Sequence, residues 1–188
     1  MEQVLIAFDN APDTDLHSFF ESCADEAKQC CVNNEHKYTS IWPPNLTEQN
    51  VVGQMDKYTI CFIASHGEKD GVYNNESKEL VSVHTTNYNF AGKTLYAVSC
   101  SCAISLKPEL QRIGLDTFVG YSDKLIVLEN DPSFLECAMS GLNSLLSGET
   151  KEVARNKMNA KYDECIANAS TPFIEAYLIH NQENLCFE

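Results

Sequence analysis

Two apolar runs that each end in a reactive side chain constrain the fold of this chain most strongly. The first covers residues 58–66 and ends in His66, and the second covers residues 94–100 and ends in Cys100. Both runs are rich in β-branched and aromatic residues, which predicts buried strands with their last side chains at the edge of a sheet. Parallel strands of one α/β sheet end at the same edge, where such sheets hold their ligands. The sequence therefore predicts an imidazole and a thiol that face one crevice.

The rest of the chain alternates between strand and helix patterns. Besides the two runs, we expect strands at residues 4–8, 38–42, 117–121 and 173–179. We expect helices at residues 13–27, 47–55, 105–113, 133–146 and 150–167, and a small β-hairpin at residues 72–83. Such alternation predicts an α/β fold with a three-layer α/β/α sheet of about six mostly parallel strands and flanking helices. The 188 residues suffice for one domain with a full core and are few for two, so a single domain over residues 1–188 is expected.

Composition disfavours several classes of protein. With 27 acidic against 13 basic residues and a formal charge of −14, nucleic-acid binding is disfavoured, whereas solubility or a basic partner is favoured. No apolar stretch approaches the length of a membrane-spanning helix, and the N-terminus matches a strand and lacks the basic region of a signal peptide. Nine cysteines without regular spacing indicate a reducing compartment rather than a disulfide scaffold, so we expect a cytoplasmic location.

A thiol beside an imidazole indicates nucleophilic catalysis. Cys100 would attack a carbonyl carbon while His66 takes its proton or holds it as a thiolate, so we expect the pKa of this thiol to be lowered. Gly67 has no Cβ, so its N–H can approach a substrate carbonyl, and with the N–H of Cys100 it would form an oxyanion hole. This chemistry needs no cofactor.

Other roles and other residues compete with this assignment. Cys100 has the alternative role of a buried structural cysteine, since free cysteine is among the most buried residue types. His66 has the alternative role of a polar strand cap. Cys102 is the competing nucleophile, and His84 is the reserve base because it lies between the hairpin and the next strand. A metal site is discarded because no Cys-x-x-Cys pair or zinc-like spacing appears.

The stretch from about residue 58 to residue 103 resembles a known family. Ser-His-Gly at residues 65–67 closes one hydrophobic strand and Cys100 closes the next, which is similar to the caspase-like cysteine peptidases: caspases, metacaspases, legumain, separase and the bacterial CHAT proteins. Cys-Ser-Cys-Ala at residues 100–103 resembles the Cys-x-Ser-Ala/Gly of the CHAT and separase branch, with Cys102 where that branch usually has Ser. The caspase Gln-Ala-Cys-x-Gly is absent, and His66 is closer to Cys100 than the roughly 50 residues typical of caspases.

The resemblance implies a caspase-like fold and a cysteine endopeptidase that cleaves protein substrates through His66 and Cys100, regulated by a partner protein or by proteolytic activation. It also implies a substrate pocket shaped by the residues after the first and fifth strands, which here are Asp9 and Asp123. Two carboxylates would favour Arg or Lys at P1, the residue before the cleaved bond. A helix-capping or turn role for Asp9 and a solvated loop role for Asp123 are the alternatives.

Two other functions stay open. The first is a catalytically inactive scaffold or interaction domain with the same fold, which a thiol-reactive probe distinguishes because an inert domain has only ordinary thiols. The second is a flavodoxin-like binding module, which is the weaker alternative because no glycine-rich phosphate loop follows residues 4–8.

Overall fold

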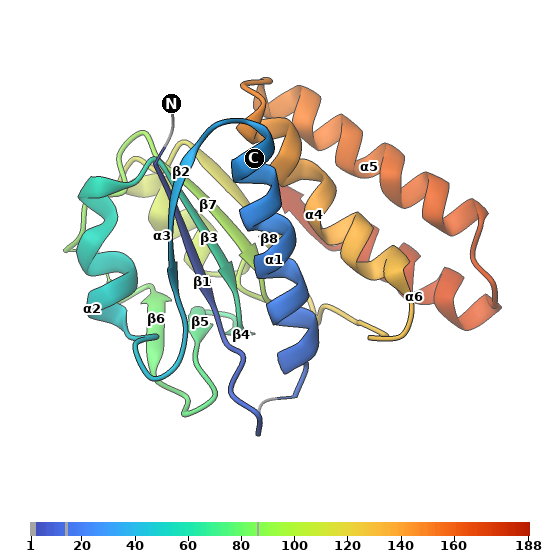
Figure 1. The fold of residues 1–188 in the computed structure, drawn as a ribbon, viewed down its shortest axis with the longest axis horizontal. Helices are drawn as coiled ribbons and strands as arrows, with labels where there is room; N and C mark the ends of the chain where they lie inside the picture. The colour runs from blue at the N-terminus through green and yellow to red at the C-terminus, as the bar shows by residue number, and fades with distance from the viewer. Residues whose placement is uncertain (1–2, 14, 86) are drawn as a thin grey trace.

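The centre of the molecule is a six-stranded sheet (Figure 1). The computed structural model describes residues 3–13, 15–85 and 87–188. Along the sheet the strands are β2 (Lys37–Ile41), β1 (Gln3–Phe8), β3 (Ile60–Ala64), β7 (Thr94–Val98), β8 (Thr117–Tyr121) and β9 (Leu185–Phe187). The first five are parallel, and β9 pairs antiparallel with β8. This order places β3 and β7, the strands of the two apolar runs, side by side at the centre.

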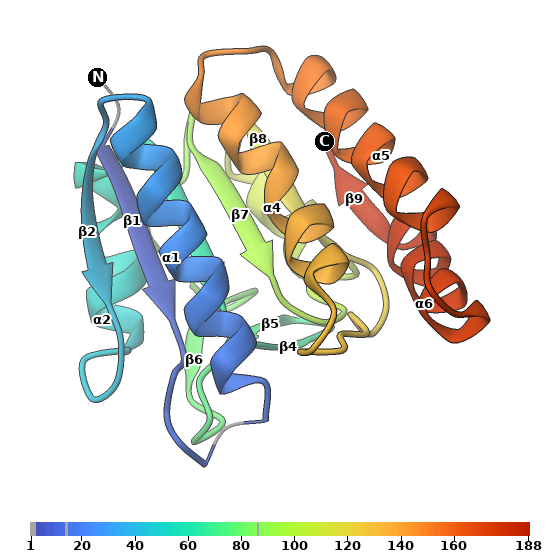
Figure 2. The ribbon, with the colours of Figure 1, turned by 45° about the vertical axis from the view of Figure 1, so that its right-hand side comes forward.

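Helices cover both faces of the sheet. On one face lie α1 (His17–Asn33) and α4 (Pro132–Leu146), with α5 (Lys151–Ala167) packed against α4 and α6 (Pro172–Glu183) packed against α5 (Figure 2). The other face carries α2 (Glu48–Val51), the 3-10 helix η1 (Val52–Lys57) and α3 (Leu106–Arg112). The predicted three-layer α/β/α class is confirmed.

Each face of the sheet has its own hydrophobic core. In β1, the side chains of Val4, Ile6 and Phe8 belong to the core under α1 and α4. Those of Leu5 and Ala7 belong to the core under α2 and α3. Because both faces are buried, successive residues of a central strand are all apolar. This double burial is the reason that the strands appear in the sequence as continuous apolar runs.

A small antiparallel sheet leaves the main sheet directly after β3. It consists of β4 (His66–Glu68), β5 (Gly71–Tyr73) and β6 (Glu79–Ser82). The hairpin expected at residues 72–83 is confirmed as the antiparallel pair of β5 and β6, and β4 adds a third strand. Ser65 makes the transition, because its N–H donates to the Val98 carbonyl at 3.3 Å while its hydroxyl donates to the Tyr73 carbonyl at 2.6 Å. The expectation of one strand running through to His66 is therefore wrong, since Ser65 bonds to both sheets. His66 instead opens β4.

Residues 173–179, expected as the sixth strand, belong to α6 instead. The hydroxyl of Thr171 accepts the N–H of Ile174 at 3.3 Å, and Pro172 occupies the first turn, so two helix-start signals precede the apolar residues. Helical spacing then places Leu178 and Asn181 on the buried face. The sixth strand is β9, an antiparallel edge strand that the sequence pattern did not indicate.

The helix expected at residues 47–55 is also shorter than predicted. Thr47 caps it, with its hydroxyl accepting the N–H of Asn50 at 3.3 Å. The α-helix ends at Val51 and the chain tightens into η1, which contains Gly53. Glycine is unfavourable inside an α-helix, which explains why the regular helix stops before it.

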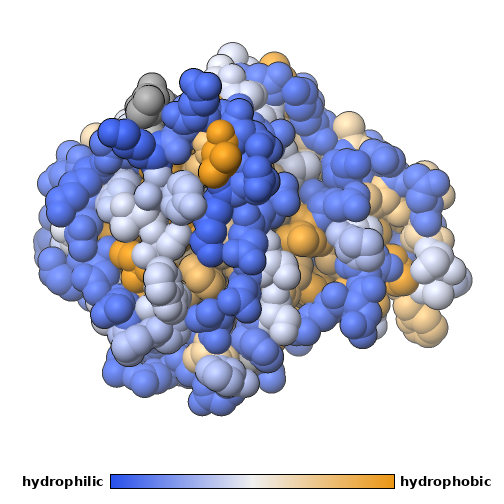
Figure 3. Space-filling view, in the orientation of Figure 1, coloured by the Kyte–Doolittle hydropathy of each residue, from blue (hydrophilic) through white to orange (hydrophobic). Residues whose placement is uncertain are grey.

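None of the helices in the described ranges is long and apolar enough to cross a membrane. The face seen in Figure 3 is mostly hydrophilic, and its hydrophobic atoms occur in small separate groups. That face therefore offers no broad apolar patch of the kind that marks a large interaction surface.

Candidate active site

The backbone of Gly67 lies directly against the backbone of Cys100. A methyl group built on Gly67 would lie 2.8 Å from the Cys100 nitrogen and even closer to its carbonyl oxygen and to the Ser99 hydroxyl. Two of these three atoms are backbone, which cannot move aside cheaply, so only glycine fits at this position. The contact shows that the chain just after β3 and the chain just after β7 meet at Gly67 and Cys100.

The register of the sheet explains this meeting. Ala64 of β3 pairs with Val98 of β7, the last residues of their strands. His66 and Cys100 each follow two residues beyond that pair. Because the strands are parallel neighbours, their equivalent extensions emerge from the same edge of the sheet. Register therefore brings the two extensions to one edge, although neither His66 nor Cys100 lies within the strand to which it was assigned.

The ring of His66 is held by a helix from the core side. His66 is half-buried, and its ring meets the ring of Phe20 edge to face, with centroids 5.5 Å apart and an interplanar angle of 88°. Phe20 lies on α1 and is only 3% exposed. The sequence indicated Phe20 only as part of the apolar face of a helix. Its contact with the imidazole was missed because helical spacing shows which face is buried and not what that face meets.

Cys100 sits in a tight turn. Its thiol is half-buried and donates a weak hydrogen bond to the Leu125 carbonyl at 3.9 Å. The following residue, Ser101, has φ of 53°, in the left-handed region that non-glycine residues rarely adopt. The N–H of Ser101 donates to the Asp123 carbonyl at 2.9 Å, which helps to hold that conformation. Strained backbone of this kind recurs at functional sites.

Burial is the main influence on the Cys100 thiol. It raises the pKa of Cys100 above its ordinary value, and the carboxylates of Glu68 and Asp123 act in the same direction. A backbone hydrogen bond at Leu125 and the Lys124 ammonium group lower the pKa without overcoming burial. The thiol is therefore protonated at neutral pH, and the expectation of a lowered pKa is wrong for the resting protein. A histidine base would have to take the proton during attack.

Cys102 is placed differently from Cys100. Its side chain is fully buried in the core on the α2 and α3 face, where its thiol contacts the Ser99 carbonyl at 3.6 Å. Burial raises the pKa of Cys102 to about 12. A buried, protonated thiol is a poor nucleophile, so Cys100 is the better candidate.

His84, the reserve base, lies in the turn after β6. Its N–H donates to the Ser82 hydroxyl at 3.1 Å. In the small sheet β6 and β4 are the two outer strands, with β5 between them. His84 thus lies beyond the strand farthest from His66, which makes His66 the better candidate base.

The two aspartates expected to line a substrate pocket have different environments. Asp9 is fully buried, and its two oxygens accept the N–H groups of Ala11 at 3.2 Å and of Asn75 at 2.6 Å. Asp9 therefore links the end of β1 to the loop between β5 and β6 by hydrogen bonds. This is the structural turn role named above as the alternative for Asp9. This burial leaves Asp9 no surface for a P1 side chain, contrary to the sequence-based expectation.

Asp123 is exposed and close to the nucleophile. Its carbonyl holds the N–H of Ser101, and its carboxylate accepts the N–H of Lys124 at 2.7 Å. The same carboxylate influences the Cys100 thiol electrostatically. Of the two aspartates, Asp123 is thus the one that remains available to a substrate at this edge of the sheet.

Comparison with solved structures identifies the fold. The chain matches gingipain R (RgpB), an Arg-specific cysteine proteinase, with a TM-score of 0.71 and 9% identity over 97% of this chain and 45% of that chain. A complex of the pro- and mature domains of RgpB from Porphyromonas gingivalis gives a TM-score of 0.70 and 9% identity over 98% of this chain and 46% of that chain. The secreted C11 cysteine protease iotapain from Bacteroides thetaiotaomicron gives a TM-score of 0.58 and 11% identity over 91% of this chain and 64% of that chain. The chain has the caspase-like fold.

The caspase-like likeness is one of structure. No protein-family model and no curated protein matches the sequence. The chain spans less than half the length of the gingipain chains that it matches. Identities of 9 to 11% establish the shared fold and leave the chemistry to be argued from the residues of the site.

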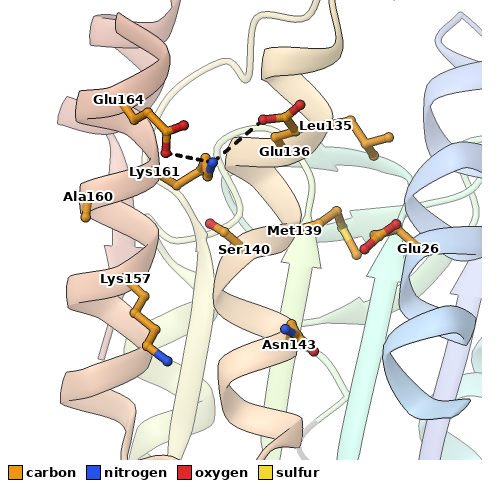
Figure 4. Close-up of a pocket in the computed structure, with 10 residues that line it drawn as sticks. All are labelled: Glu26, Leu135, Glu136, Met139, Ser140, Asn143, Lys157, Ala160, Lys161 and Glu164. Carbon is orange, nitrogen blue, oxygen red and sulfur yellow. Dashed lines mark hydrogen bonds and ion pairs between the residues drawn. The ribbon is translucent and has the colours of Figure 1, made fainter. Parts of the chain in front are cut away.

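A groove of about 570 Å³ lies away from the candidate site of the caspase-like fold, between α4 and α5 with one residue from α1 (Figure 4). Its lining combines apolar residues such as Met139 with paired charges, since Lys161 contacts Glu164 at 2.8 Å and Glu136 at 3.8 Å. It contains no cysteine or histidine. Over the described part of the chain, no cluster of three or more His, Cys, Asp or Glu side chains is arranged to hold a metal ion.

Proposed function

We propose that this chain is a cysteine endopeptidase that cleaves protein substrates through Cys100 and His66. The observation that supports the proposal most directly is the backbone contact between Gly67 and Cys100, which brings a histidine, a cysteine and two backbone N–H groups to one edge of a caspase-like sheet. Cysteine, histidine and paired backbone donors are the groups that acyl transfer requires. The CHAT, separase and metacaspase branch and a cytoplasmic location belong to the same proposal, supported by residues 100–103 and by the nine free thiols.

In the proposed reaction, the Cys100 sulfur attacks the peptide carbonyl carbon as its proton passes to the His66 imidazole. The carbonyl oxygen becomes an oxyanion, which the N–H groups of Gly67 and Cys100 stabilise. The imidazolium then protonates the leaving amine as the C–N bond breaks, which leaves a thioester on Cys100. A water molecule gives a proton to His66 and adds to the thioester. The C–S bond then breaks, and the proton passes from His66 to the Cys100 sulfur, which restores the thiol.

Substrate preference follows from charge. Asp123 is exposed beside the nucleophile turn, and Glu68 is also close enough to act on the thiol. The whole chain carries a formal charge of −14. An acidic rim repels Asp or Glu at P1 and attracts Arg or Lys, so we propose cleavage after basic residues.

The test is cleavage of a peptide library with every residue type at P1, using the wild-type protein and Cys100→Ala. Cleavage that requires Cys100 and prefers Arg or Lys supports the proposal. Cleavage with Asp or a small apolar residue at P1 would contradict the assignment of specificity. No cleavage of any peptide, together with no preferential labelling of Cys100 by a peptide-based electrophile, would contradict the peptidase proposal itself.

A catalytically inactive scaffold with the same fold is the second candidate function. The observation that favours it is the raised pKa of the half-buried Cys100, since many catalytic cysteines have a lowered pKa. Labelling with a peptide-based electrophile separates the candidates. A peptidase labels at Cys100 faster than with a simple alkylating reagent, because substrate binding positions the electrophile, whereas a scaffold shows no such difference.

A further inference from the structure

The segment that follows β8 has one side directed to the nucleophile turn. Alternate residues share this side, with their carbonyl oxygens accepting hydrogen bonds from successive parts of the turn. They are Tyr121, Asp123 and Leu125, which accept the Ala103 N–H at 3.0 Å, the Ser101 N–H at 2.9 Å and the Cys100 thiol at 3.9 Å. The position of Cys100 therefore depends on the position of this segment.

The residues between them are held by the last turns of α6. The N–H of Ser122 donates to the Asn184 carbonyl at 2.8 Å. The ring of His180 donates from Nε2 to the Lys124 carbonyl at 2.9 Å. Residues 121–126 thus form a bridge, with odd positions bonded to the nucleophile turn and even positions bonded to α6 or to its C-cap residue Asn184.

Asn181 makes two of the contacts on the α6 side. Its side-chain amide forms hydrogen bonds with both backbone groups of Ile126. Nδ2 donates to the Ile126 carbonyl at 2.7 Å, and Oδ1 accepts the Ile126 N–H at 2.9 Å. Asn181 is 2% exposed. Buried polar side chains are costly unless their hydrogen bonds are satisfied, and here one loop residue satisfies both ends of the amide. Such a two-sided contact fixes the loop in position and orientation.

We propose that Asn181 is a positioning residue. Its two hydrogen bonds to Ile126 keep Asp123 and Leu125 in contact with the nucleophile turn. The inference rests on the proposed peptidase function for its catalytic consequence, and on the hydrogen bonds alone for its structural one. The side-chain hydrogen bonds of Asn181 both go to Ile126, so it acts on Cys100 through the bridge. Its loss should leave the core intact while the wall beside Cys100 becomes mobile.

The experiment compares Asn181→Leu with Gln182→Ala. The first variant keeps the side-chain size and removes both hydrogen bonds to Ile126. The second is a matched control one residue further along α6, because the Gln182 amide donates to the Asn159 carbonyl at 3.3 Å and to the Asp163 carboxylate at 2.8 Å on α5, away from the bridge. His180→Ala, at a more exposed position, replaces Asn181→Leu if that variant does not fold.

Three quantities are measured well below the melting temperature: hydrogen exchange of residues 122–126, alkylation of Cys100 by iodoacetamide, and kcat/KM for an Arg-P1 peptide. For Asn181→Leu we expect exchange and alkylation to rise about 5- to 30-fold and kcat/KM to fall by a similar factor. Gln182→Ala should change none of the three more than about twofold. Opposite changes in alkylation and cleavage are a signature that general destabilisation of a folded enzyme does not explain.

Equal effects of the two variants, or unchanged exchange of residues 122–126 in Asn181→Leu, would overturn the positioning role. If the wild-type protein cleaves no peptide but exchange and alkylation respond as expected, the peptidase proposal fails while the role of Asn181 stands. The two results are therefore distinguishable.

Discussion

The ring of Phe20 on α1 stands edge to face against the ring of His66, with 5.5 Å between the centroids. An aromatic edge against an imidazole restricts the rotation of the ring and excludes water from one side of it. The candidate base is therefore oriented by a core residue from a distant part of the sequence. A substitution at Phe20 can therefore disturb the orientation of His66 while His66 itself stays unchanged.

Phe20→Leu should lower kcat/KM about 10- to 100-fold, because small misplacement of a reacting group is costly. The loss of stability should be about 1 to 3 kcal/mol, as for other core substitutions. Phe19→Leu is the control, since Phe19 is the neighbouring buried aromatic on α1 and its ring is 6.3 Å from that of Phe20. Peptide hydrolysis and thermal melting measure the two effects. A similar loss of activity in both variants would mean that stability and not orientation is responsible.

Gly67→Ala should abolish cleavage, because its methyl group would meet the backbone of Cys100 and displace the oxyanion donors. We expect kcat to fall about 100-fold or more. Gly53→Ala is the matched control, since the methyl group there meets only the flexible side chain of Gln49. Circular dichroism and hydrolysis assays report on fold and activity. Full activity in Gly67→Ala would show that this backbone contact is not part of the catalytic site.

Cys100→Ala and His66→Ala should each abolish cleavage and leave the protein folded, since both residues are half-buried at the sheet edge. Cys102→Ala should keep its activity and lose about 1 to 2 kcal/mol of stability, because it removes a buried side chain from the core. Peptide hydrolysis and denaturant titration measure both quantities. The opposite pattern, an active Cys100→Ala and an inactive Cys102→Ala, would exchange the roles of the two cysteines.

The pH dependence of Cys100 alkylation tests the environment of the thiol. Burial raises the pKa of Cys100, so the proton is retained to higher pH than in an ordinary cysteine. The alkylation rate should therefore keep rising with pH through about 8.5, the reference value for cysteine, and level off above it. Rates between about pH 6 and pH 10, with the modified residue identified by mass spectrometry, measure the profile on both sides of that reference value. An inflection below about 7.5 would instead reveal a thiolate held by His66.

Asp123→Asn should reduce kcat/KM for Arg-P1 peptides about 10-fold or more, because binding buries the cation against the carboxylate. Asparagine retains an oxygen that can accept the Lys124 N–H, so the loop should stay in place. Glu129→Gln removes an exposed charge later in the same loop and should have little effect. Kinetics with Arg-P1 and Leu-P1 peptides give the comparison. Equal losses for the two peptides would exclude a specificity role for Asp123.

The sequence determined the layers of this protein and the edge of the sheet at which His66 and Cys100 lie. Residues buried on both faces, such as Leu5 and Ile6, appear as continuous apolar runs, so central strands can be recognised without knowing their partners. Because parallel strands end at one edge, the contact of Gly67 with Cys100 could be predicted from their places after two such runs. The cap Thr150 and the buried helix faces are local signals of the same kind.

Only the tertiary structure decided the environment of each residue. Asp9 and Asp123 follow equivalent strands, yet Asp9 is buried by Asn75 from a loop far along the chain while Asp123 stays exposed. The raised pKa of Cys100 and the grip of Asn181 on Ile126 likewise depend on segments that meet only after folding. Desolvation and hydrogen bonding are set by whatever surrounds a group in space, and periodicity along the chain records only which face is buried.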